Sequence, residues 1–192
     1  DLPLPRRRVL ALQVIVDRAR AHGDTPAPSR PYKAYLHLTA TPEGDIAPLG
    51  RVEDLGPATS AMIRDWLTGS RVTVTPVLDP DRGDPIDAHD PPEWMRELVI
   101  ARDQHCVFPD CRRPARRCDL DHIDPYDPHG PPGQTHPGNL APLCRRHHRA
   151  KTTTDPTKQW RYRRMDHGHY TWTGPQDQRL VVVPGIGTYS PG

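Results

Sequence analysis

Four potential metal ligands occur as two closely spaced pairs within residues 106–151, and this spacing constrains the fold more than any other feature of the chain. Cys106 and Cys111 are separated by four residues, and Cys144 and His147 by two. Thiolate and imidazole donors at such short spacings are typical of tetrahedral Zn²⁺ sites, in which four protein ligands close the coordination shell. We therefore predict a structural zinc site formed by these four residues.

The composition favours a fold that is held together by a metal ion. Only 34% of the 192 residues are hydrophobic, 25 are proline and one is phenylalanine, so we expect small cores and many turns. A disulfide framework is the alternative, but it is typical of smaller, secreted chains. The remaining cysteine, Cys118, is then either packed as a small hydrophobic residue or a zinc ligand in place of His147.

Basic residues flank the metal pattern on both sides. The formal net charge of +2 is too small to indicate nucleic acid by itself, and a solvated basic surface is one interpretation of the clusters. Next to a metal pattern, however, we expect such a surface to contact backbone phosphates. The residues are Arg112, Arg113, Arg116, Arg117, Arg145, Arg146, Arg149 and Lys151.

The first ninety residues have the pattern of a small α+β segment, with proline and glycine separating the elements. The arginine-rich start is similar to a signal peptide, but its apolar run is short and ends at Asp17, so we interpret it as a helix. We predict a helix over 9–22, a linker over 23–32, strands over 34–40 and 45–50, a helix from Pro57 to Gly69 and a strand over 71–79.

The second half of the chain begins, by our interpretation, in the Asp/Pro-rich loop near residue 90. An amphipathic helix leads directly to Cys106, and alternating segments follow the metal pattern. We predict a helix over 91–103, a strand over 118–122, a helix over 144–151, strands over 159–164, 169–173 and 179–183, and an irregular tail.

An acid–imidazole pair ends the predicted strand over 118–122. Neighbouring strand side chains point to opposite faces, so Asp121 can hold a metal ion while His122 faces a substrate. His147 and His148 diverge by about 100° on a helix, which lets one serve zinc and the other a second metal near Asp121. Cys144 precedes them by three and four positions, and either spacing suits a shared helix face.

These segments resemble the HNH endonucleases, whose motif occupies a ββα-metal finger. The resemblance lies in CVFPDC, DLDHI, PGNLAPLC and RRHHRAK, within residues 106–151, and it is strongest to the actinobacterial group in which an HNH module follows a domain of unknown function. It implies an α+β fold with a zinc-stapled ββα-metal HNH module and a C-terminal β-meander over 91–192. Residues 1–90 would then be the tail of a preceding α+β domain of unknown function.

The resemblance also implies a role for each motif residue. His122 corresponds to the first motif histidine, the general base, and Asn139 to the asparagine that positions this base or the loop around it. His148 corresponds to the last motif histidine, which holds one catalytic Mg²⁺ or Mn²⁺ together with Asp121. His147 then belongs to the structural Zn²⁺ site, at a position where many relatives have cysteine.

The expected function is therefore metal-dependent hydrolysis of phosphodiester bonds, most plausibly in double-stranded DNA. One alternative is a catalytically silent zinc module that binds nucleic acid, which would not need Asp121, Asn139 and His148 together. Another is a nuclease of the RNA-cleaving or toxin type. No run in the sequence reaches the roughly 18–20 apolar residues of a membrane span, so we expect a cytoplasmic protein that does not bind membranes.

Overall fold

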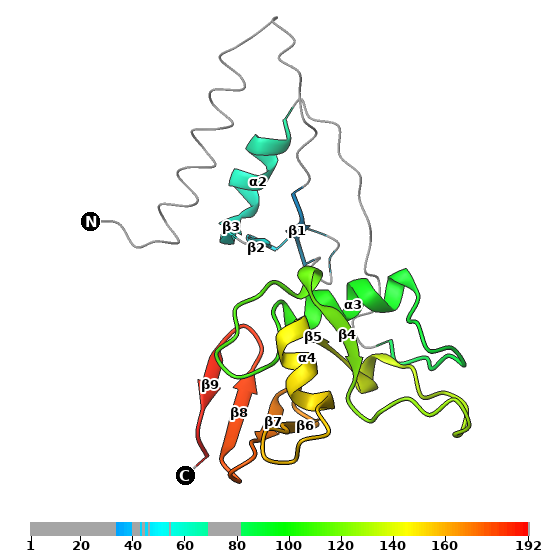
Figure 1. Cartoon of the computed structure of the whole chain (residues 1–192). Coiled ribbons are helices and arrows are strands. Elements are labelled where there is room, and N and C mark those ends of the chain that lie inside the picture. Colours follow the sequence, from blue (N-terminus) through cyan, green and yellow to red (C-terminus); the bar gives the residue numbers. More distant parts are fainter. Residues whose placement is uncertain are drawn as a thin grey trace, which may run out of the picture. The chain divides into compact units, whose positions relative to one another are not determined.

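The computed structural model describes residues 34–39, 43, 45, 47–53, 55–68 and 82–191 (Figure 1). They form a mixed α+β structure whose described part contains three α-helices and several antiparallel sheets. The chain divides into two compact units, Asp1–Thr75 and Pro76–Gly192. The predicted helix over 9–22, the linker over 23–32 and the strand over 71–79 lie outside the described residues.

In the first unit, a small antiparallel sheet is followed by a helix. Val52, Ala58 and Ile63 form the buried core between them. The strands predicted over 34–40 and 45–50 correspond to the first two strands, of which the first is shorter and the second lies farther along the chain. The elements are β1 (Leu36–His37), β2 (Leu49–Val52), β3 (Gly56–Thr59) and α2 (Ser60–Leu67), with the sheet order β1-β2-β3.

The prediction that Pro57 opens a helix is wrong, because Pro57 lies in β3. Among the described strands β3 pairs with β2 alone, so it is an edge strand of the described sheet, and proline is tolerated in an edge strand. The helix α2 begins at Ser60 instead. Thr59 caps it, because its hydroxyl accepts a hydrogen bond of 3.2 Å from the backbone N–H of Met62.

The second unit contains the metal pattern. The strands β4 and β5 form an antiparallel hairpin in which Asp119 lies opposite Leu143 and His122 opposite Leu140, and α4 follows β5 at once. The ranges predicted for α3, β4 and α4 match those observed to within two residues. The elements are α3 (Glu93–Asp103), η1 (Ala115–Arg117), β4 (Asp119–His122), η2 (Pro137–Asn139), β5 (Leu140–Leu143) and α4 (Arg145–Thr152).

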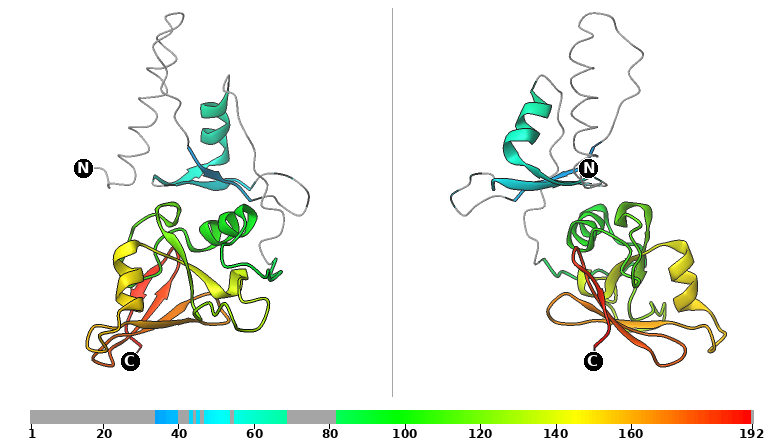
Figure 2. Two further views of the ribbon diagram at one scale, coloured as in Figure 1. Left: turned by 45° about the vertical axis from the view of Figure 1, so that its right-hand side comes forward. Right: turned by 90° about the vertical axis from the view of Figure 1, so that its left-hand side faces the viewer.

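A four-stranded antiparallel meander completes this unit (Figure 2). Three of its strands lie where alternation predicts them, but the prediction of an irregular tail is wrong, because Gly187–Tyr189 pairs with the third strand. The pairing joins Val181 to Tyr189 and Val183 to Gly187. The strands are β6 (Arg161–Arg164), β7 (Tyr170–Thr173), β8 (Arg179–Val183) and β9 (Gly187–Tyr189), in the order β6-β7-β8-β9.

Aromatic side chains of the meander pack against the metal pattern and form the main core. Trp172 is fully buried, stacks on Tyr162 with ring centroids 4.3 Å apart, and donates a hydrogen bond of 2.7 Å to the carbonyl of Val107. The same core includes the side chains of Cys106 and Leu143. The segment that begins at Cys106 is therefore fixed on the sheet by both apolar and polar contacts.

A buried ion pair connects α3 with the segment that leads into β5. The guanidinium of Arg102 contacts the carboxylate of Asp103 at 2.7 Å and donates to the carbonyls of Pro137 (2.6 Å) and Leu140 (2.7 Å). The hydroxyl of Tyr170 donates to Asp103 at 2.9 Å. This network therefore holds η2, whose last residue is Asn139, and the start of β5 against α3 and β7.

Residues just before α3 also belong to the second unit. Ile86 forms a β-bridge with Thr135, and the carboxylate of Asp87 accepts a hydrogen bond of 2.5 Å from the backbone N–H of Gly133. The structure thus divides the chain earlier than the boundary predicted near residue 90. Within the described part of the chain, no helix is both long and apolar enough to cross a membrane.

Candidate metal centre and the adjoining polar site

The candidate site is built on the β4–β5 hairpin and α4, which lies against both strands (Figure 1). Because α4 starts immediately after β5, it runs back along the hairpin toward the end at which His122 lies. Side chains of α4 meet β4 in order along the two elements: Arg145 lies beside Asp119, and His148 beside Asp121. The hairpin and helix therefore present polar side chains to one another along their length.

The structure brings together the four residues predicted from the paired spacing. The donor atoms of Cys106, Cys111, Cys144 and His147 all lie within 4.8 Å of one another, and Nδ1 of His147 lies 3.4 Å from the sulfurs of both Cys106 and Cys144. Zinc bonds of about 2.3 Å to sulfur and about 2.1 Å to nitrogen in a tetrahedron place neighbouring donors roughly 3.5–3.8 Å apart. The cluster has the donor set and size to hold a zinc ion.

Local backbone structure shapes the cluster. Asp110 has a φ of 57°, in the left-handed region, which turns the chain so that Cys111 returns toward Cys106. The sulfur of Cys106 also accepts a hydrogen bond of 3.4 Å from the backbone N–H of Cys144, the residue that precedes α4. The ring of Phe108 stacks on His147 with centroids 3.8 Å apart, and this contact fixes the imidazole plane.

The protonation of the cluster depends on whether a metal is bound. A hydrogen bond with the Cys118 thiol, followed by burial, raises the pKa of Cys106, and burial raises the pKa of Cys111 to about 12. Without a metal these groups are therefore thiols at neutral pH, and zinc would displace their protons on binding. Burial, and then the charge of Arg146, lowers the pKa of His147, which favours the neutral imidazole that a metal requires.

Cys118 lies outside this cluster. It is buried in the main core, and its thiol contacts the carbonyl of Pro114 at 3.4 Å. Of the two interpretations of Cys118 that the sequence leaves open, the structure favours a packed core thiol, and the ligand position is taken by His147.

A second polar site surrounds the carboxylate of Asp121, whose side chain is only 4% exposed. One oxygen, Oδ2, accepts hydrogen bonds of 2.7 Å from the ammonium of Lys151 and of 2.7 Å from the hydroxyl of Tyr162. The other, Oδ1, lies 3.1 Å from Nε2 of His148. The two oxygens of this carboxylate therefore have different surroundings, and His148 is separated from the zinc cluster that contains its neighbour His147.

His122 points to the other face of the hairpin. Its Nε2 lies 2.8 Å from the hydroxyl of Thr135, and its ring lies beside those of His89 and Tyr126, with centroids 5.2 and 5.5 Å away. Burial, and then the charge of His89, lowers the pKa of His122. The imidazole is therefore neutral at neutral pH and can accept a proton.

Asn139 fastens the two ends of the long loop between β4 and β5. Its side-chain oxygen accepts a hydrogen bond of 2.8 Å from the N–H of Asp124, and its amide group donates to the carbonyls of Asp124 (3.1 Å) and Gln134 (2.9 Å). The contacts of Asn139 thus reach the backbone next to His122 and Thr135. Of the two roles implied for this residue, they fit the positioning of the loop.

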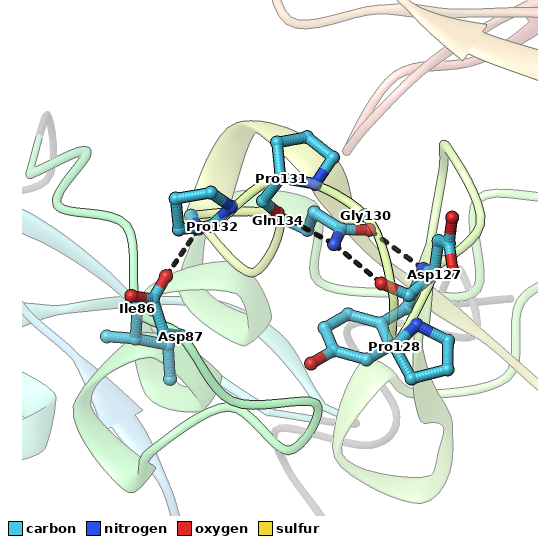
Figure 3. A pocket seen from close by; sticks show the side chains of 10 residues that line it. Ile86, Asp87, Asp127, Pro128, Gly130, Pro131, Pro132 and Gln134 are labelled. Atoms are coloured by element: carbon cyan, nitrogen blue, oxygen red, sulfur yellow. Dashed lines mark hydrogen bonds between the residues drawn. The ribbon is translucent and has the colours of Figure 1, made fainter.

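The loop, together with Ile86 and Asp87, lines a partly open cavity of about 270 Å³ (Figure 3). At one side of this cavity Gln134 fastens the loop, because its amide donates to the carbonyls of Asp127 and Pro131, both at 2.8 Å. Asp87 lies at its other side and holds the backbone of Gly133. Since Asp121 and His148 do not line this cavity, it is separate from the polar site.

Six of the eight basic residues predicted to contact phosphates are exposed, and two have other roles. Arg116 is half-buried and forms a two-pronged ion pair with Glu97 at 2.5 and 2.9 Å. Lys151 is half-buried and bonds both the carboxylate of Asp121 and the carbonyl of His122. The exposed residues are Arg112, Arg113, Arg117, Arg145, Arg146 and Arg149.

The sequence does not indicate three residues that contact Asp121 or His122. Tyr162 contacts Asp121, and Thr135 and His89 lie beside His122. Tyr162 comes from β6 and Thr135 from the loop, and both reach the site only through the fold. The alternation of RYRR over 161–164 predicts that Tyr162 is buried, but it carries no signal for a carboxylate partner.

Comparison with known proteins finds relatives without described functions. The chain is 33% identical over 177 residues to the uncharacterized protein Rv2100 of Mycobacterium tuberculosis, an alignment that covers 88% of this chain and 31% of the relative. It is 38% identical over 101 residues to the uncharacterized protein Rv3776 of the same organism, which covers 53% of this chain and 18% of the relative. The chain thus spans about a third of the length of Rv2100. No family model and no solved structure matches the chain.

The cluster leads to a first prediction. Purified protein should contain one zinc ion per chain, and Cys111→Ser should lose it and lower the free energy of unfolding by more than about 4 kcal/mol, because the small core depends on the metal. Elemental analysis and urea unfolding measure both quantities. Cys118→Ala is the matched control, since it removes a buried thiol outside the cluster and should keep the zinc. Loss of zinc from this control as well would show that Cys118 is a ligand in place of His147.

Proposed function

We propose that the second unit is a metal-dependent HNH endonuclease module that hydrolyses phosphodiester bonds in DNA. The observation that carries the proposal is that Asp121 of β4 and His148 of α4 face each other at 3.1 Å, with His122 directly after Asp121 at the end of β4. The cluster that could hold zinc lies at the start of α4 and includes His147, the neighbour of His148, in agreement with a zinc-stapled ββα-metal arrangement. The sequence resemblance described above assigns the same residues to catalysis.

His122 acts as the general base in this proposal. The hydroxyl of Thr135 donates toward the carbonyl of His89 at 3.5 Å, so its oxygen is available to accept from Nε2–H of His122. We infer that Nδ1 is then the unprotonated nitrogen. It removes a proton from water, the water oxygen forms the new bond to phosphorus, and the 3′ oxygen of the nucleotide leaves. Products with 5′-phosphate ends follow from this direction of attack.

Asp121 and His148 are the residues that would hold the catalytic Mg²⁺ or Mn²⁺. Their facing atoms are 3.1 Å apart, close to the separation of two ligands that each lie about 2.1 Å from one ion in octahedral geometry. Two protein ligands are sufficient for Mg²⁺, which usually keeps several waters and takes phosphate oxygens as further ligands. When bound, such an ion neutralises charge on the phosphate and on the leaving oxygen.

Lys151 and Tyr162 are positioning residues for this ion. Both bond Oδ2 of Asp121, which leaves Oδ1 directed toward His148. A neutral group that orients a metal ligand in this way, as the hydroxyl of Tyr162 does, usually contributes strongly to metal affinity. The six exposed arginines would contact backbone phosphates, and such contacts position a duplex without reading its sequence.

A catalytically silent zinc module that binds nucleic acid is the second candidate, and an RNA-cleaving or toxin-type nuclease is the third. The buried Asp121 network disfavours the silent module, because a purely structural role does not need a carboxylate oxygen facing an accessible imidazole; His148 is 40% exposed. Cleavage assays with DNA and with RNA distinguish a DNA nuclease from an RNA nuclease.

Cleavage of supercoiled plasmid in the presence of Mg²⁺ or Mn²⁺ is the direct test, with a single-stranded RNA of similar length in parallel. His122→Ala should lower the cleavage rate by about 10²–10⁴, because it removes the general base, and should leave zinc content and DNA binding intact. His129→Ala is the matched control, since His129 is exposed in the loop that follows β4 and should not affect the rate. A His122→Ala protein that cleaves as fast as wild type would contradict the assignment.

The adjacent histidines give a further prediction. His147→Ala should lose zinc and lower the melting temperature, because it removes a ligand of the cluster. His148→Ala should keep zinc and folding but raise the Mn²⁺ concentration needed for half-maximal cleavage. Zinc analysis, thermal unfolding and metal titration of both variants distinguish the two. Identical behaviour would mean that the chain does not have two distinct metal sites.

Tyr162→Phe tests the positioning of Asp121. The variant keeps the ring that stacks on Trp172 but loses the hydrogen bond to Oδ2, so the Mn²⁺ affinity should fall by about 10-fold or more. Electron paramagnetic resonance of free Mn²⁺ measures this affinity without cleavage. Tyr170→Phe is the matched control, because it removes a hydroxyl that donates to a different buried carboxylate, Asp103. Equal Mn²⁺ affinities in the two variants would remove Tyr162 from the site.

A further inference from the structure

An arginine-lined hollow of about 220 Å³ lies at the start of α4, at the end of the hairpin away from His122. Among the described lining residues the one carboxylate is that of Asp119, which lies 3.8 Å from Nε of Arg145, a loose contact between exposed side chains. The hollow therefore carries a large surplus of positive charge. Its lining residues are Arg113, Arg117, Asp119, Cys144, Arg145 and Arg146.

The lining chemistry selects for a phosphate group. Guanidinium groups bind phosphate oxygens through two parallel hydrogen bonds, and four arginines are among the residues that line the hollow. None of its described lining residues is aromatic, so they offer no surface on which a nucleic-acid base would stack. The sulfur of Cys144 belongs to the zinc cluster and is committed elsewhere. The hollow thus recognises charge and shape rather than a base.

The position of the hollow relative to the metal pair follows from the secondary structure. Asp119 and Asp121 are two residues apart on β4, so their side chains share one face, about 7 Å apart along the strand. Their partners on α4, Arg145 and His148, are three residues apart and share one helix face. The hollow and the metal pair therefore lie next to each other in one line along the same face.

We propose that this hollow binds a non-scissile phosphate of the substrate strand, the one next to the phosphate that is cleaved at Asp121 and His148. The position of that phosphate along the strand rests on the proposed nuclease function, whereas the anion site itself does not. The hollow would set which phosphodiester bond reaches His122, because a strand held at two neighbouring phosphates cannot slide past the base. Arg112 and Arg149, which are exposed but do not line the hollow, have no part in this register.

The first experiment tests the anion site without cleavage. Inorganic phosphate is titrated into the zinc-loaded protein while the arginine side-chain NMR signals are followed. We expect saturable shifts in wild type that are lost in the Arg113→Gln/Arg146→Gln double variant and kept in the Arg112→Gln/Arg149→Gln control. All four positions are exposed, so folding is checked by zinc content and circular dichroism. Equal shifts in both double variants would overturn the site.

The second experiment tests the register with a short DNA duplex bound by the His122→Ala protein. The Arg113→Gln/Arg146→Gln change, made in that protein, should weaken binding by about 10-fold and make the slope of log K against log salt shallower by about one. A second control, Arg161→Gln/Arg163→Gln, changes exposed arginines of β6 that have no part in the proposed phosphate contacts, and it should change binding by less than about 2-fold. The same binding and the same slope in both double variants would overturn the proposal.

A third measurement needs no arginine variant. A single uncharged methylphosphonate is placed on either side of the bond that wild type cleaves, and cleavage should slow at one of these two positions only. No effect at either position would refute the register. If no nucleic acid is cleaved at all while phosphate still saturates the hollow, the proposed nuclease function fails and the anion site stands.

Discussion

The rest of the second unit depends on the junction at which Cys106 and Cys111 meet Cys144 and His147. This junction ties the segment after α3 to the residue that precedes α4, two parts of the chain that lie far apart in sequence. Because Cys144 both contributes its sulfur and ends the turn into α4, the cluster fixes where the helix begins. Every residue of α4 that reaches β4 is placed by that start. A metal ion bound to this cluster would stabilise the alignment of α4 with the β4–β5 hairpin as well as the loop that contains Cys106 and Cys111.

The C-terminal meander is the second support of the polar site. Trp172 holds the segment after Cys106 through its hydrogen bond to Val107, and Tyr162, on the neighbouring strand, stacks on Trp172 and reaches Asp121. One sheet therefore contacts both the cluster and the carboxylate. A module cut after α4 would lose the tyrosine that orients Asp121 as well as most of the aromatic core.

The sequence was sufficient where a pattern depends on spacing along the chain. The paired ligands predicted the cluster, and strand alternation predicted that Asp121 and His122 face apart. The sequence-based predictions were wrong where tertiary contacts determine the local structure. Pro57 lies in an edge strand of the described sheet instead of a helix. The tail forms β9 because it pairs with the edge of β8. Lys151 is a further example. A lysine among arginines has the pattern of a phosphate-binding surface, but on α4 the ammonium of Lys151 points to the buried carboxylate of Asp121. Thr135 and Tyr162 could not be predicted as partners, since nothing in sequence links them to His122 or Asp121.

In the proposed mechanism, the carboxylate of Asp121 contributes to stability and also holds the catalytic ion. An isolated buried carboxylate is costly, and Lys151 offsets that cost with a full positive charge at Oδ2. In the proposed mechanism a divalent ion approaches the same carboxylate at Oδ1, so the two cations do not compete for one oxygen. They do repel each other, and the fixed ammonium therefore makes the ion bind more weakly than two unpaired ligands would. In the proposed mechanism, an ion that is bound this weakly needs a phosphate oxygen of the substrate to complete its coordination. Metal binding is then coupled to substrate binding, and the arginines next to the site contribute to both.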